Sequence, residues 1–332
     1  MRRYIELSAR IFKIRRLIDY RRRAVFVLRS LAHHAGMSEL IAFFDGNAVR
    51  REIVARNPWI FEQVTRQIFY RRSTFRERMS LIKAHYLLFE NCFTTDAMRS
   101  ICLGEGLELW RGEFQDSPVS LKLCCNPRDR REGLATMVLK LGNHTLYRMI
   151  FWAGHDKDGR VELRIGSLQG AAGRLKTYRD LTKHFFGYRP KNLVLYALRM
   201  VARKLQAARI QAISNSGFFA NNHLRADRKL QTSLNEFWQE AGGEISADPR
   251  FFDLPIAEPR KRMEETKSHK HTLYRNRFAL IDEIDRVMAM VLDENMNPPG
   301  RPASPAKPAP GKFLGTTATG SLSHRPKEQV MS

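Results

Sequence analysis

Apolar and polar residues alternate most clearly near the middle of the chain. Val161, Leu163 and Ile165 fall on one side of an extended segment, with charged or small residues between them. A period of two is typical of a β-strand with one buried face. The strand reaches Gly170, and Gly173 follows shortly after, so we expect a glycine-rich turn directly behind it.

The pattern then changes to the three- and four-residue spacing of helices. Helical spacing begins at Thr177, and a second, longer helix is predicted to start at Pro190, because proline suits a first helical turn. The short apolar run from Ile210 to Ser214 predicts another strand. A strand–helix–strand unit of this kind favours parallel pairing with a right-handed crossover. Three basic residues of the longer helix are expected to be solvated: Arg199, Arg203 and Lys204.

The N-terminal third of the chain is predicted to be helical. Residues 1–36 read as a basic amphipathic extension. We expect its apolar stripe either to lie on an anionic surface or to pack on the rest of the protein with the arginines solvated. Residues 37–105 are predicted to form a helical subdomain, in which Ser73 caps a helix from Thr74 to Asn91. The apolar stripe of the extension comprises Leu7, Ile11, Ile14 and Ile18.

From about Leu107 the period shifts to two, and this shift predicts further strands separated by tight turns, one of them at Gly142. The fold class that follows is α+β, with a mixed, mostly antiparallel sheet and a closing C-terminal helix over residues 106–292. Residues 293–332 are rich in Pro and Ala, so we predict a disordered tail.

The net charge is the property of the sequence that says most about a binding partner. Lys and Arg number 57 against 34 Asp and Glu, a formal net charge of +23. Such an excess favours an anionic partner: nucleic acid, an anionic membrane surface or a small phosphorylated ligand. The basic N-terminal segment is the expected contact for either macromolecular surface. The alternative is a basic solubilising surface, because the charge is spread along the chain.

Cysteine content and hydropathy bear on location. The chain has 4 cysteines and no CxxC pair, which argues for a reducing compartment and against a zinc site. No apolar run is long enough to span a bilayer, and charges interrupt every candidate signal-peptide core. We therefore expect a cytoplasmic protein, with peripheral placement at the inner membrane as a further expectation from the basic extension.

An ordered set of short segments resembles the bacterial VirK/YbjX group, a domain of unknown function. The resemblance spans about residues 50–292. It implies an accessory role in envelope stress, virulence or resistance to cationic antimicrobial peptides, and some members are grouped with the DNA-damage response. No established chemistry comes with it. The segments are RERMSLIKAHYLLFE (76–90), IGSLQG (165–170), LTKHFFGYRPKNL (181–193), AISN (212–215), FW.EAGG (237–243), FFDLP (251–255) and KSHKHTLYRNRF (267–278).

The order of elements is also similar to the GNAT-like acyl-CoA N-acyltransferase fold. The resemblance implies that the turn after the central strand would hold the pyrophosphate of an acyl-CoA, because backbone N–H groups and the helix dipole favour an anion. The residues that this implies as cofactor-binding are Gln169, Gly170, Gly173 and Arg174.

Other side chains are candidates for chemistry. Glu162 is a candidate general base, although a Glu in such a strand commonly pairs with a neighbouring Arg. Asn215 closes a strand where a GNAT-like site places a polar group, and it also suits a plain turn. Tyr274, Arg275 and Arg277 are candidates for binding a phosphate or for a solvated helix face. No metal-binding pattern, Walker loop, nucleophile elbow or nucleic-acid motif is present.

Three functional hypotheses remain open from the sequence. The first is an accessory factor of the VirK/YbjX type working at the inner membrane face. The second is an acyltransferase that uses acyl-CoA. The third is a nucleic-acid-associated protein of the DNA-damage response. Whether the protein is an enzyme is left open by all of these observations.

Overall fold

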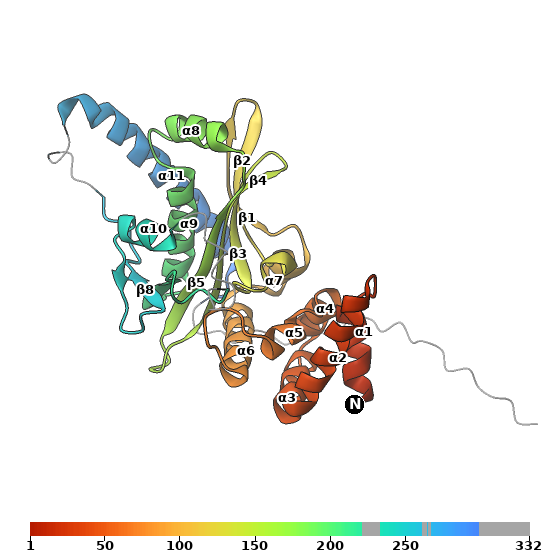
Figure 1. The fold of residues 1–332 in the computed structure, drawn as a ribbon. Coiled ribbons are helices and arrows are strands. Elements are labelled where there is room, and N and C mark those ends of the chain that lie inside the picture. The colour runs from red at the N-terminus through yellow and green to blue at the C-terminus, as the bar shows by residue number, and fades with distance from the viewer. Residues whose placement is uncertain (221–232, 261–263, 265–266, 299–332) are drawn as a thin grey trace, which may run out of the picture.

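The computed structural model describes residues 1–220, 233–260, 264 and 267–298. Helices fill the first hundred residues, and Figure 1 shows α1 to α5 gathered together at one end of the molecule. A β-sheet with helices on both sides follows. The N-terminal helices are α1 (Arg2–Ile11), α2 (Leu17–Ala32), α3 (His34–Asp45), α4 (Ala48–Arg56), α5 (Ile60–Thr65), α6 (Phe75–Cys92) and α7 (Thr95–Leu103).

The basic extension is two helices rather than one. The helical structure is interrupted between α1 and α2. There the Asp19 carboxylate accepts hydrogen bonds from the backbone N–H groups of Arg15 and Arg16, and these bonds cap the start of α2. The predicted stripe is therefore divided. Leu7 and Ile11 are buried in the core. Ile14 and Ile18, the other two stripe residues, are exposed.

The helix α6 begins at Phe75, one residue later than predicted. Thr74, not Ser73, caps it: the Thr74 hydroxyl accepts from the backbone N–H of Glu77, and the Glu77 carboxylate accepts from the backbone N–H of Thr74. The Ser73 hydroxyl instead donates to the carbonyl of Ile68, inside the turn that precedes the helix.

The described residues form an eight-stranded mixed sheet of order β1-β2-β3-β4-β5-β6-β8-β7. β5 and β6 are parallel, and every other neighbouring pair is antiparallel. The predicted α+β class with a mixed, mostly antiparallel sheet is confirmed. The strands are β1 (Leu107–Phe114), β2 (Ser117–Cys124), β3 (Ala135–Leu141), β4 (His144–His155), β5 (Val161–Gly170), β6 (Arg209–Ile213), β7 (Glu244–Ile245) and β8 (Phe251–Leu254).

Helices α8 (Leu175–His184) and α9 (Pro190–Lys204) cross from β5 to β6. α9 packs on β3, β4 and β5, and α11 (His271–Asn295) packs on α9 and β1. Figure 1 shows α9 and α11 on one side of the sheet and α7 on the other, where α6 also reaches β4. The described residues also form the short helix α10 (Leu234–Glu240) and the 3-10 turns η1 (Pro127–Asp129) and η3 (Ser268–Lys270).

Two expectations about the second half of the chain need correction. Arg199 is not solvated. Its side chain is 2% exposed, because it faces the segment that follows β8 rather than water. The last helix also runs to Asn295, and the Asn297 side chain donates to the carbonyl of Phe93, so the ordered structure extends past residue 293. The rest of the predicted tail, from 299 onward, lies outside the described residues.

Candidate functional site

The glycine-rich turn after β5 is anchored to the sheet by a chain of side chains. The Gln169 amide oxygen accepts from Arg148 at 2.7 Å, and Arg148 forms an ion pair of 2.7 Å with the buried carboxylate of Asp129. Asp129 also accepts from the Thr136 hydroxyl at 2.9 Å. Gln169 is thus held on the sheet surface by a charged residue of β4, and the turn begins from a fixed position.

The turn leads directly into α8. This helix starts at Leu175, two residues earlier than the predicted Thr177. The first backbone N–H groups of an α-helix have no partner within the helix. Arg174 is the N-cap residue of α8, and its side chain makes no capping hydrogen bond to them. Gly173 has φ +72°, and no atom of the described residues lies within 4 Å of the place a Cβ would take. An exposed turn with free N–H groups is suited to an anion.

A basic hollow of about 780 Å³ lies along α8 and beside the first residues of α9. Tyr147 and Tyr178 form part of its wall, with ring centroids 4.7 Å apart. The Tyr178 hydroxyl donates to the carbonyl of Ala171, so this wall is attached to the glycine-rich turn. Five basic side chains also line it: Lys176, Arg179, Lys183, Arg189 and Lys191.

A carboxyl group with a shifted pKa belongs to a loop that lies against the middle of β5. Burial first, and then the Asp129 charge, raise the pKa of Glu132 to about 7. The residue belongs to the loop between β2 and β3, and this loop crosses the sheet at Gly166. A Cβ at position 166 would overlap the carbonyl oxygen of Glu132, so only glycine allows the loop to lie this close. Burial also raises the pKa of Asp129.

Sequence reasoning missed Glu132 and Arg148 as candidate site residues. Neither belongs to a motif, and Glu132 precedes β3 by a few residues in a charged, glycine-containing loop. The available signal was Arg148, the single charge in an otherwise apolar central strand. A lone charge in a buried strand requires a partner, but the sequence does not say which residue supplies it.

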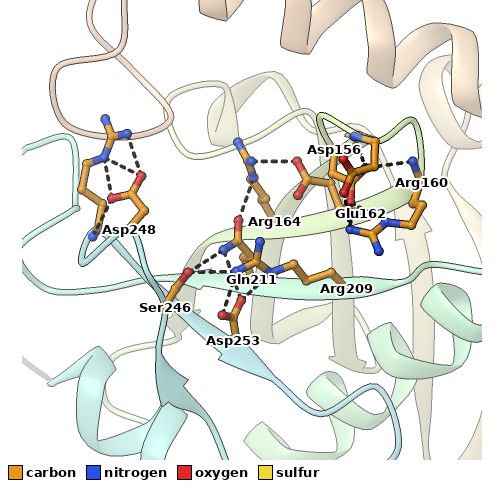
Figure 2. Close-up of polar contacts among 11 residues, drawn as sticks. Asp156, Arg160, Glu162, Arg164, Arg209, Gln211, Ser246, Asp248 and Asp253 are labelled. Atoms are coloured by element: carbon orange, nitrogen blue, oxygen red, sulfur yellow. Dashed lines mark hydrogen bonds and ion pairs between the residues drawn. The ribbon is translucent and has the colours of Figure 1, made fainter.

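Glu162 lies at the other end of β5. Figure 2 shows Arg164 between Glu162 and Gln211, bonded to Glu162 at 2.7 Å and to the amide oxygen of Gln211 at 3.1 Å. The network continues to Asp253, which forms a two-bond ion pair with Arg209. The predicted alternative of a Glu paired with its neighbouring Arg is therefore what the structure contains. Glu162 precedes Gly170 by eight residues, roughly 26 Å along an extended strand, so it is not near the turn.

Asn215 fastens α10 to the end of β6. Its amide oxygen accepts from the backbone N–H of Leu234 at 3.0 Å, and its own backbone N–H donates to the Asn235 side chain at 2.8 Å. Both bonds satisfy backbone or turn positions, in accord with the turn interpretation of this residue.

The three candidate residues on α11 do not all lie on the same side of the helix. Tyr274 and Arg277 face the N-terminal end of α9, with the Arg277 guanidinium 4.6 Å from the centre of the Tyr274 ring. Arg275 points to solvent. The anion-binding candidates and the cofactor-binding candidates thus occupy two different places: the glycine-rich turn precedes α8, whereas Arg277 lies against Phe186 and Gly187 in the α8–α9 connection.

The fold and these sites describe a basic α+β protein with a parallel strand pair and a glycine-rich turn. Among the helices of the described ranges, none combines the length and the apolar character that crossing a membrane requires. A family model described as "Protein of unknown function (DUF535)" matches residues 15–290. The chain therefore belongs to this family, the VirK/YbjX family.

Two relatives illustrate the match. The chain is 26% identical over 242 residues to the "Uncharacterized protein YbjX" of Escherichia coli, covering 71% of this chain and 73% of the relative. It is 28% identical over 125 residues to an uncharacterized protein of Haemophilus influenzae, covering 37% of this chain and 42% of that protein. Neither printed name states an activity.

Proposed function

We propose that this protein binds acyl-coenzyme A at the turn between β5 and α8 and is an acyltransferase of the GNAT-like type. The observation that carries the proposal is that the parallel pairing of β5 with β6 stops well before β5 ends. β6 pairs with β5 only from Glu162 to Ile165, and β5 then continues to Gly170 along β4 alone. Beyond the carboxyl end of this parallel pair, β5 leads into the turn before the uncapped N-terminus of α8.

The chemistry of the ligand matches the surroundings of that turn. A pyrophosphate would accept hydrogen bonds from the uncapped N-terminus of α8 and gain from the helix dipole. Additional phosphate charge would lie in the basic hollow, where Lys176, Arg179 and Lys183 are available. The register shift that bulges Gly166 out of the β4–β5 pairing marks the place where β5 leaves β6.

Glu132 supplies the proton acceptor for the proposed reaction. An amine or hydroxyl nucleophile attacks the thioester carbonyl, its proton passes to the Glu132 carboxylate, and coenzyme A leaves as the thiolate. A carboxyl group whose pKa is about 7 is suited to this role at neutral pH. This assignment replaces Glu162, because Glu162 is committed to Arg164 and lies at the far end of the strand.

The experiment is a thermal-shift titration of the full chain with acetyl-CoA, a long-chain acyl-CoA, free CoA and ATP. A ligand at a hundred times its dissociation constant stabilises a fold by roughly 2.7 kcal/mol, so a clear shift is expected with the CoA compounds and none with ATP. Gly173→Asp should abolish the shift, since it places a carboxylate at the phosphate position.

The matched control is Gly159→Asp. Gly159 has φ +77°, close to the +72° of Gly173, and a Cβ added there would likewise meet no atom of the described residues within 4 Å, so both substitutions carry the same backbone strain. Gly159→Asp should keep the full shift. The acyl-CoA proposal is wrong if no CoA compound shifts the wild type, or if both variants lose the shift equally.

We propose attachment to an anionic membrane surface as a second function, in line with an envelope-related accessory role. Its support is an outward apolar stripe on α2, quite different from the stripe read in the sequence. Leu17, Tyr20 and Leu28 are 88%, 58% and 65% exposed and recur at helical spacing on one side. Arg21 lies next to the stripe, and residues 1–32 carry ten Lys or Arg against two Asp or Glu. Apolar residues with flanking arginines fit an anionic bilayer interface.

Co-sedimentation with vesicles tests this second function. We expect binding to vesicles containing phosphatidylglycerol, none to pure phosphatidylcholine, and steep weakening with salt. Leu17→Ser with Leu28→Ser should reduce the bound fraction strongly, whereas Leu87→Ser, an exposed leucine on α6, should not. Salt-sensitive binding to duplex DNA that survives the double substitution would instead favour the nucleic-acid hypothesis.

A further inference from the structure

A cavity of about 390 Å³ lies between the N-terminal halves of α9 and α11 and the segment from Glu258 to Arg260. Its size falls within the range of about 300–1,000 Å³ that small-molecule sites occupy. An adjoining hollow of about 280 Å³ shares Arg189, Asn192 and Glu258 with it. The cavity and the adjoining hollow, which both border the start of α9, are together called the recess.

Segments far apart in the sequence meet at this recess. Tyr188 and Asn192 come from the segment 181–193, and Tyr274 and Arg277 come from the segment 267–278. The adjoining hollow adds Gly242 from the segment 237–243. These are three of the segments that carry the VirK/YbjX resemblance, and the fold assembles them around one cavity.

The charges in the recess leave one cation without a carboxylate. Arg189 pairs with Glu240, and Arg260 pairs with Asp282. The carboxylate of Glu258 accepts from the Tyr188 hydroxyl at 2.5 Å and lies 3.5 Å from the buried guanidinium of Arg199. Among the described residues, no Asp or Glu pairs with Arg277. The recess therefore has a net positive charge centred on that residue.

The Arg277 guanidinium is held in place without being neutralised. Its Nε donates to the carbonyl of Phe186 at 2.9 Å, and its planar group stacks on Tyr274. Gly187, at φ +77°, makes room for it, since a Cβ there would lie 2.7 Å from one terminal nitrogen. Fixing the Nε side leaves the terminal nitrogens available for an anion, which is the fork geometry that suits phosphate.

A second observation also points to a ligand. The side-chain oxygen of Asn192 is buried and has no hydrogen-bond partner among the described residues. Asn192 lines both parts of the recess. A buried polar atom without a partner is costly, and a ligand hydroxyl would satisfy it.

We propose that this recess binds a small phosphate monoester that carries a hydroxyl group. Arg277 binds the phosphate, and Asn192 bonds to the hydroxyl. The site contains no residue of the acyl-CoA turn, although Arg189 lines both the recess and the basic hollow beside that turn, and the proposal does not rest on the function proposed there. It uses two of the three residues that the sequence marked as anion-binding candidates, and it excludes Arg275, which points to solvent.

Isothermal titration calorimetry of the full chain with glycerol 3-phosphate tests the proposal, with glycerate and glycerol as ligands lacking the phosphate. We expect saturable binding of glycerol 3-phosphate only. Arg277→Gln should weaken it roughly tenfold to a hundredfold, since a hydrogen bond to a charged group is lost. The matched control Arg275→Gln removes the same charge two residues away and should leave affinity unchanged.

Two further variants keep the test decisive. Asn192→Ala should weaken glycerol 3-phosphate without removing any charge, and Gly173→Asp should bind it as the wild type does. The proposal is overturned if glycerol 3-phosphate does not bind saturably, if glycerate binds equally well, or if Arg275→Gln weakens binding as much as Arg277→Gln. Failure of acyl-CoA to bind would leave this result untouched.

Discussion

At the scale of single residues, Arg199 has an environment that its position in the helix pattern did not indicate. Its guanidinium donates to the carbonyls of Pro255 and Ala241 at 2.9 and 2.8 Å and faces the carboxylate of Glu258. It therefore joins α9 to two segments that follow β6 in the chain. Arg203, four residues later on the same helix, is a partly exposed ion-pair partner of Asp285.

Substituting these two arginines should have very different effects. Arg199→Leu leaves buried carbonyls and a carboxylate without their partner, so we expect a loss of about 3–5 kcal/mol in the free energy of unfolding. Arg203→Leu should cost less than about 1 kcal/mol, as for exposed pairs. Urea denaturation measures both. Equal losses would show that Arg199 acts as an ordinary surface residue.

Glu132 should make stability depend on pH in a specific direction. Burial raises its pKa from 4.5 to about 7, so the folded state holds a proton that the unfolded state has released. Stability from this group is complete below pH 4.5 and falls as pH rises towards 7. Glu132→Gln should remove this fall in stability at high pH. At pH 8 its free energy of unfolding should exceed that of the wild type by up to about 3 kcal/mol, and at pH 4 it should not.

Denaturation midpoints at several pH values measure this difference. Glu105→Gln is the control, because Glu105 is exposed. Its stability should follow that of the wild type throughout. A Glu132→Gln profile parallel to the wild type would mean that the carboxyl group ionises normally in the folded state, and it would also weaken its assignment as a base.

At the scale of elements, a buried histidine of α6 forms a hydrogen bond to the backbone of β4 where the two elements pack. His85 is fully buried, and its Nδ1 accepts from the backbone N–H of Ala153 at 3.2 Å. Next to it, a Cβ at Gly154 would lie 3.4 Å from the Ala84 side chain, so helix and strand approach closely. This contact joins the N-terminal helices to the centre of the sheet.

Lowering the pH should therefore weaken this contact. Burial lowers the pKa of His85 to about 3, well below its ordinary 6.5, so unfolding takes up a proton between these values. Stability is complete above pH 6.5 and falls as pH drops, by roughly 1.4 kcal/mol per pH unit. In His85→Gln the amide oxygen of the new side chain can replace Nδ1 as the acceptor. This variant should be less stable than the wild type at pH 7, but its stability should no longer fall in this way as the pH drops. Chemical denaturation between pH 4 and 7 measures it, and identical slopes would refute the explanation.

At the scale of the whole molecule, the predicted division between helical subdomain and sheet is bridged by many contacts. Phe69 and Tyr70, from the turn before α6, pack on Trp152 of β4. At the opposite end of the chain, Asn297 donates to the carbonyl of Phe93 at 2.9 Å. Nearly all buried apolar residues of the described ranges belong to one continuous core that includes both parts; Val138 and Ile150 are the exceptions.

A shared core predicts a single cooperative unfolding transition. Pulsed hydrogen exchange in urea should give the same midpoint for peptides from α4 and from β4, because neither part can unfold without exposing the apolar surface of the other. Separate midpoints would instead support two independently stable domains. The measurement also tests the boundary predicted near residue 105.

The sequence by itself determined the elements and the fold class, because the periods of two and 3.6 are local properties of the chain. The strand from Val161 to Gly170, the turn at Gly142 and the helix beginning at Pro190 all appear where their patterns indicate. It also determined the family, since that depends on ordered segments and not on contacts. The break between α1 and α2 had a local signal too, in Asp19.

Only the tertiary structure decided which residues meet. Arg148 with Asp129, Arg199 with Glu258, and Arg277 with the start of α9 are pairs of distant positions, and periodicity carries no information about such contacts. The same limit explains the buried Glu132, whose pKa depends on a loop crossing Gly166. Burial and charge at a site are sums over neighbours in space, so they follow from the fold and not from local spacing.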